Sequence, residues 1–155
     1  MIEETISSVR PTHFFVCFVL IWFSSCTTNV KKGELVGHWE MAADAVQRLG
    51  IPKDFNKRPE LTLRADDTFT AKNMPGKIIY RFKDQTSVFS GNGRWWIPKS
   101  AWSQGFSSLI LQFSNVGGGD KAQPTLKIDK TGKDITVFAW DEEEGGERLE
   151  FHKLQ

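Results

Sequence analysis

The chain has 155 residues, with 20 basic and 19 acidic side chains and a net charge of +1. This near-neutral balance gives no electrostatic footprint for nucleic acid, and the length suits one domain. Both cysteines, Cys17 and Cys26, lie near the N-terminus, so the rest of the chain has no disulfide framework and must fold on its own core.

An apolar run of about ten residues, Phe14–Phe23, comes just before Ser24, Ser25 and Cys26. A membrane-spanning helix needs about 20 apolar residues, so this run is too short to be one. Its length fits the apolar core of a secretory signal with small residues at the cut. The segment Ser24-Ser25-Cys26 resembles the lipobox of bacterial lipoproteins, which implies cleavage after Ser25 and a lipid such as palmitate on Cys26.

Two features of the leader depart from the lipoprotein pattern. Phe23 stands where leucine is usual, and the segment before the apolar run carries Glu3 and Glu4 against a single Arg10. Translation that begins near Val9 through a non-AUG codon would remove both acids. N-terminal sequencing or the intact mass of the precursor would test this hypothesis.

The leader divides the chain into three parts. We expect a signal peptide over residues 1–25, a lipidated tether over 26–33 and one domain over 34–155. The alternatives are ordinary cleavage, which leaves a secreted protein with a free thiol, and an uncleaved anchor. The residue after the lipid site is Thr27 and not aspartate. This favours a lipid-anchored position in the cell envelope, at the outer membrane and facing the periplasm.

Short segments of alternating apolar and polar residues fill most of the body, and a helical spacing over Ala42–Leu49 ends at Gly50. Turns are expected at residues 66–68 and 129–134. The segments that alternate are Leu35–Met41, Glu60–Ala65, Phe69–Asn73, Lys77–Lys83, Val88–Ile97, Ser107–Phe113, Thr125–Ile128, Ile135–Trp140 and Glu147–Leu154. This rhythm predicts an all-β protein, an antiparallel up-and-down β-barrel of about eight strands with one short helix after the first strand.

Two short motifs resemble those of lipocalin-like proteins. Gly37-His38-Trp39 is similar to their Gly-x-Trp signature on the first strand, and the segment Leu61–Phe69 resembles the second-strand hairpin of small bacterial lipocalin-like lipoproteins. In that family a basic residue of the last strand packs over the tryptophan, and Arg148 stands at a matching place. The resemblance implies barrel closure by Gly37, Trp39 and Arg148, and a cup that takes a small apolar molecule.

The aromatic and aliphatic side chains of the strands are candidates for lining such a cup. The residues expected to contact a ligand are Trp39, Tyr80, Phe82, Trp95, Trp102, Leu111 and Phe113, with Leu61, Leu63 and Leu109 also interior. In the alternative interpretation the barrel is filled and acts as an interaction or scaffold module for another envelope protein. Its contacts would then be the outward-facing aromatics Trp96, Phe138 and Trp140, since alternation places Trp95 and Trp96 on opposite faces.

Catalytic and metal-binding patterns are weak in this sequence. After the leader only His38 and His152 remain, and no serine or cysteine stands in a nucleophile motif. Residues 129–134 lack the acidic alternation of a calcium loop, and residues 117–121 lack the spacing of a phosphate loop. We therefore expect no enzyme, no metal and no cofactor; the expected partners are the membrane, an apolar ligand or an envelope protein.

Overall fold

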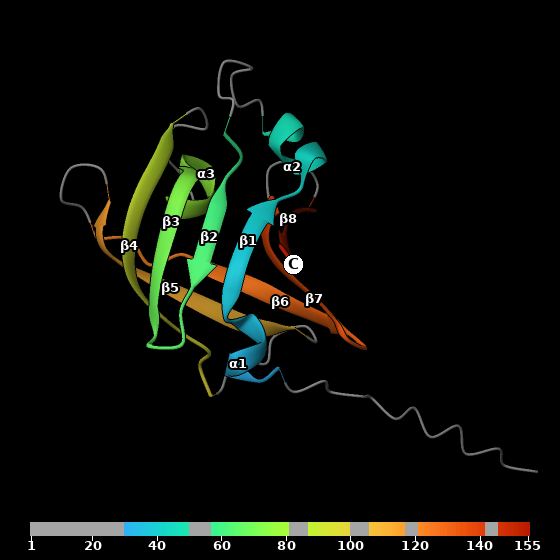
Figure 1. Cartoon of the computed structure of the whole chain (residues 1–155). Helices are drawn as coiled ribbons and strands as arrows, with labels where there is room; N and C mark the ends of the chain where they lie inside the picture. Colours follow the sequence, from blue (N-terminus) through green and yellow to red (C-terminus); the bar gives the residue numbers. More distant parts are fainter. Residues whose placement is uncertain (1–29, 50–56, 81–86, 100–105, 117–120, 142–145) are drawn as a thin grey trace, which may run out of the picture.

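Eight antiparallel strands follow one another around a closed barrel, in which the last strand pairs with the first (Figure 1). The computed structural model describes residues 30–49, 57–80, 87–99, 106–116, 121–141 and 146–155. The strands are β1 (Gly37–Met41), β2 (Glu60–Leu63), β3 (Thr68–Pro75), β4 (Val88–Trp96), β5 (Ser107–Val116), β6 (Thr125–Thr131), β7 (Asp134–Asp141) and β8 (Glu147–Lys153). The predicted up-and-down barrel is confirmed.

In the described residues three short helices accompany the strands: α1 (Lys32–Leu35), α2 (Ala43–Arg48) and α3 (Gly76–Ile79). Helix α1 lies at the end of the barrel where β1 begins, and α2 and α3 lie toward the opposite end (Figure 1). Leu35 of α1 and Ala45 of α2 are fully buried. The helix predicted over Ala42–Leu49 is confirmed as α2, whereas Leu35 belongs to α1 and the strand expected over Leu35–Met41 begins at Gly37.

The segment expected as a strand over Lys77–Lys83 was predicted wrongly in its described part, because Gly76–Ile79 is helical. Pro75 ends β3, since proline has no N–H to continue the ladder. Ile78 and Ile79 are then both buried, which one helical turn allows and a strand with two opposite faces does not. Residues 81–83 lie outside the described part.

The turn between β2 and β3 follows from its short acidic side chains. Asp66 Oδ1 accepts hydrogen bonds from the Thr68 backbone N–H (3.0 Å) and from its hydroxyl (2.7 Å), and Asp67 has a positive φ of 70°. Aspartate is one of the few residues besides glycine that adopts this conformation readily. The turn predicted at 66–68 is therefore confirmed, although the turn between β6 and β7 is shorter than the predicted 129–134 and centres on Gly132.

Glycine allows the strands β4 and β5 to approach closely at one point. A Cβ on Gly93 would overlap the carbonyl oxygen of Gln112, and one on Gly91 would lie 2.9 Å from a ring carbon of Phe113. The register between β4 and β5 shifts at Asn92/Gly93, as in a β-bulge. The phenylalanine ring of β5 therefore occupies the space that a side chain on β4 would have filled.

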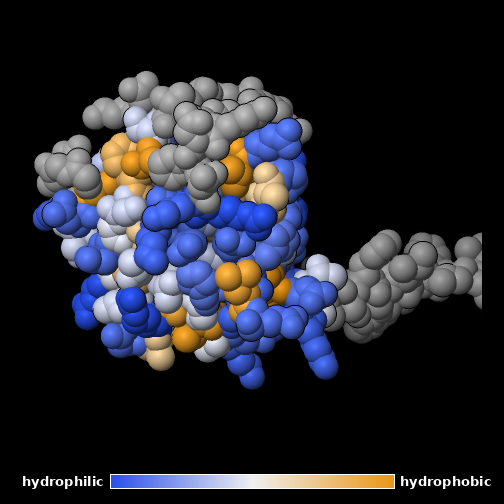
Figure 2. Space-filling view, turned by 45° about the horizontal axis from the view of Figure 1, so that its top comes forward, coloured by the Kyte–Doolittle hydropathy of each residue, from blue (hydrophilic) through white to orange (hydrophobic). Residues whose placement is uncertain are grey.

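The folded domain begins earlier than predicted. Val30 is buried in the same core as the strands, and Lys32 already belongs to α1, so the tether expected over 26–33 overlaps the domain. The closed sheet and its buried core lie within residues 30–155. Hydrophilic side chains cover most of the described surface visible in Figure 2, as expected for a barrel whose apolar residues face inward.

Candidate functional site

Four of the seven side chains predicted to contact a ligand are buried inside the barrel. Trp39, Trp95, Leu111 and Phe113 are each exposed by 1% or less. A hollow large enough to admit water would expose part of the side chains that line it. These four residues therefore pack against other side chains and leave no free surface for a ligand.

Aromatic packing and hydrogen bonds hold this interior in place. The rings of Phe69 and Phe113 meet edge to face, with their centroids 4.8 Å apart. Trp39 Nε1 donates to the carbonyl oxygen of Leu35 at 2.9 Å, and Trp95 Nε1 donates to that of Arg64 at 3.0 Å. Both indole N–H groups thus have the partner that a buried tryptophan requires.

Of the other three predicted ligand contacts, only Tyr80 lies in the described part of the chain. It follows α3 rather than standing on a strand, is half-buried, and packs edge to face on Phe89 with centroids 5.3 Å apart. Phe82 and Trp102 lie outside the described residues, so their predicted role stays a prediction.

The barrel end that carries α1 is closed by Gly37, Trp39 and a cation, but the cation is Lys153 and not the predicted Arg148. Lys153 pairs with Trp39 across β1 and β8, and its Nζ lies 5.8 Å from the indole centroid. The same Nζ donates to the carbonyl oxygen of Glu34 at 2.9 Å. Gly37 has φ +147°, a backbone conformation that residues with a side chain rarely adopt, and a Cβ there would force the end of the Lys153 side chain to move.

Alternation along β8 explains the correction. Leu149 and Phe151 point inward and are buried, which places Lys153 on the same side and Arg148 on the outer face. Side-chain parity on the last strand was the signal that sequence reasoning missed.

Arg148 instead organises a cluster of aromatic rings on the outside of the barrel, which we call the outer cluster: Phe106, Phe138, Trp140 and Arg148. The guanidinium carbon lies 4.5 Å from the ring centroid of Phe138, 4.9 Å from that of Phe106 and 5.5 Å from that of Trp140. Arg148 Nη1 also pairs with Asp129 Oδ2 at 2.8 Å. Cation–π contacts of this kind contribute about 0.5–2 kcal/mol each.

The outer cluster changes which aromatics face solvent. Phe138 was predicted to be an exposed contact, but it is fully buried because Phe106 and Arg148 cover it. Trp140 is 37% exposed and Trp96 is half-buried. Of the three aromatics proposed as partner contacts, the two tryptophans therefore keep accessible surface.

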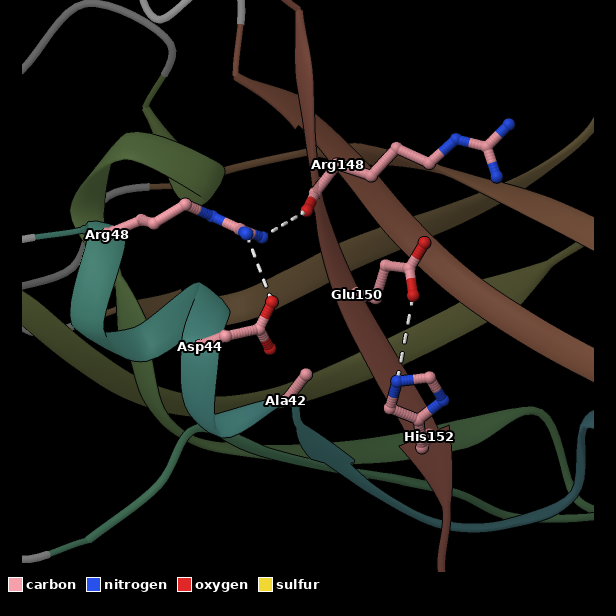
Figure 3. A pocket seen from close by; sticks show the side chains of 6 residues that line it. All are labelled: Ala42, Asp44, Arg48, Arg148, Glu150 and His152. Carbon is pink, nitrogen blue, oxygen red and sulfur yellow. Dashed lines mark hydrogen bonds and ion pairs between the residues drawn. The ribbon is translucent and has the colours of Figure 1, made fainter.

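A recess of about 440 Å³ lies outside the barrel, between α2 and β8 (Figure 3). Arg48 donates to Asp44 Oδ2 and to the backbone oxygen of Arg148, both at 3.0 Å, and Glu150 pairs with His152 at 3.6 Å. The Arg148 side chain points away from the other charged groups in the recess (Figure 3). The charged groups of the recess are thus largely paired with one another. The recess is lined by Ala42, Asp44, Arg48, Arg148, Glu150 and His152.

The two histidines of the described residues, His38 and His152, lie on the outer wall of the barrel. His38 Nδ1 is 2.8 Å from Thr62 Oγ1, and its Nε2 is 3.8 Å from Glu60. Within the described ranges, no three His, Cys, Asp or Glu side chains are placed to hold a metal ion. No helix in this described part has the length and apolarity needed to cross a membrane.

No protein family, curated protein or solved structure matches this chain.

Proposed function

We propose that this protein is a lipid-anchored barrel of the cell envelope that binds a partner through its outer surface and holds no small molecule inside. The observation that carries the proposal is the burial of Trp39, Trp95, Leu111 and Phe113 to 1% exposure or less. This favours the filled-barrel interpretation over the apolar cup.

A ligand inside this barrel would carry a large energetic cost. A small-molecule site normally provides a cavity of about 300–1,000 Å³ whose walls are largely formed before the ligand arrives. In this barrel a ligand would first have to displace large side chains, and emptying one aromatic position costs about 3–5 kcal/mol. A function at the surface carries no such cost.

The leader supports the lipid anchor. Cleavage before Cys26 would leave three residues, 27–29, between the acylated cysteine and the buried Val30. Metabolic labelling with palmitate tests the anchor: the wild-type chain is expected to take up label and to fractionate with membranes. Cys26→Ala should abolish both properties, whereas Cys17→Ala should change neither. A wild-type chain without label would overturn the anchor.

The outer tryptophans are the proposed contacts with the partner, and Trp140 is the more exposed of the two. Aromatic residues with accessible rings are enriched at protein interfaces. A photoreactive amino acid at position 140 is expected to give a discrete adduct in cells. The matched control is Gln112, an exposed residue on the outer face of β5. Equal adducts from both positions, or none from position 140, would contradict a surface site there.

A further inference from the structure

Basic side chains gather at the α1 end of the barrel, which we define by α1, the β2–β3 and β6–β7 turns and the ends of β4 and β8. Eight basic residues lie there against four acidic ones, Glu34, Asp66, Asp67 and Asp134. The rest of the chain after Cys26 has 11 basic and 13 acidic residues. The eight are Lys31, Lys32, Arg64, Arg94, Lys99, Lys130, Lys133 and Lys153.

Most of this positive charge is available to a partner. All eight basic side chains except Lys130 belong to exposed residues. Two ion pairs lie within this end, Glu34 with Lys130 at 2.7 Å and Asp67 with Lys32, and they leave six basic side chains against two acidic ones. The α1 end therefore presents a cationic surface, although the protein as a whole is nearly neutral.

The chain also brings this end close to the proposed lipid. Val30 is buried at the α1 end, four residues after Cys26. Four residues reach about 14 Å when fully extended. The Debye length is about 8 Å at physiological ionic strength, so charges on this end would lie within one or two screening lengths of the headgroups.

We infer that the α1 end of the barrel docks on a bilayer surface that contains anionic lipid. The occupant follows from charge complementarity and from the short reach of residues 27–29, so the inference rests on the lipid anchor proposed for Cys26. Docking in this way leaves α2 and α3 facing away from the bilayer (Figure 1).

Vesicle flotation of residues 26–155 carrying Cys26→Ser tests the inference, since this part holds the closed barrel and its core. The protein is expected to float with vesicles that contain phosphatidylglycerol, to release at high salt, and not to float with phosphatidylcholine alone. Absence of flotation with phosphatidylglycerol, or flotation insensitive to salt, would overturn it.

Matched charge reversals locate the surface. Each basic residue near an anionic membrane contributes about fivefold to partitioning, so three reversals at the α1 end, which remove three basic residues and add three acidic ones, should lower the partition coefficient by more than about 100-fold. The test variant combines exposed residues of that end: Lys31→Glu, Lys99→Glu and Lys133→Glu. The control makes the same change in net charge elsewhere, also at exposed residues: Lys57→Glu, Lys72→Glu and Lys121→Glu.

The control variant is expected to keep most of its binding. An equal fall in both variants would mean attraction by overall charge and would refute the docking surface, and thermal melts check that each variant is folded. Flotation uses no lipid on Cys26, so its failure removes only the docking surface. Failure of palmitate labelling removes the anchor and leaves the flotation result standing.

Discussion

Phe113→Ala tests whether the barrel is filled. Phe113 is 1% exposed, packs edge to face on Phe69 and covers the side-chain space of Gly91. Removing a buried phenylalanine costs about 3–5 kcal/mol, of which about 0.5–1.5 kcal/mol comes from the aromatic pair. Domains of this size are stable by about 5–15 kcal/mol, so the variant should lose a large fraction of its stability.

Urea unfolding followed by tryptophan emission measures this loss. The midpoint should fall with little change in the slope, because the surface exposed on unfolding stays nearly the same. The control Phe113→Leu keeps most of the buried volume and should cost less. Phe113→Ala should also gain affinity for a small apolar probe such as benzene, since an apolar cavity in a core stays dry. A loss below about 1 kcal/mol would mean that the ring lines a space already empty and would refute the filled interior.

Three further predictions concern the α1 end and the outer wall of the barrel. Lys153→Met should cost about 1 kcal/mol in urea unfolding and alter Trp39 emission, because it removes the cation over the ring; unchanged emission would contradict the assigned closure. The pKa of the Glu34 carboxyl is lowered, first by the hydrogen bond from the Lys130 ammonium and second by that from the Lys31 backbone N–H. The contribution of Glu34 to stability is therefore present above its unfolded pKa and is lost as pH falls through its folded pKa. Glu34→Gln should lower Tm at neutral pH and flatten its decline in acid, and an unaltered acid limb would count against this pairing. Arg148→Gln should uncover the outer cluster and raise binding of a surface dye. Arg148→Lys should restore the cover over the rings only in part, because a lysine lacks the planar group that stacks on them. Full restoration of the cover by lysine would argue against stacking.

Alternation and turn residues were sufficient to predict the barrel. Strands such as Glu60–Leu63 show a clear period of two, and the pair Asp66–Asp67 marks the turn that follows. Alternation predicted the wrong structure for one segment, in which the residues do not stand on a strand with one buried face. The segment after Pro75 has apolar residues at every second position, yet it forms α3, because burial of Ile78 and Ile79 on one side outweighs the pattern.

The candidate site was harder to predict than the fold. Parity along β8 places Lys153 and Phe151 on one face and Arg148 on the other, so the closing cation was within reach of sequence reasoning. Whether the interior is hollow was not, because that depends on how strand stagger and side-chain volumes combine. The burial of Phe138 by Phe106 likewise joins residues far apart in sequence, and no local pattern announces it.

Titration of residues 26–155, again with Cys26→Ser, with an environment-sensitive apolar dye is the most direct test of the filled barrel. The buried Trp39 and Trp95 report on the interior through their emission. We expect no saturable change in tryptophan emission. We also expect that a long-chain fatty acid displaces no bound dye. Saturable one-to-one quenching that a fatty acid reverses would show an internal site and contradict the account.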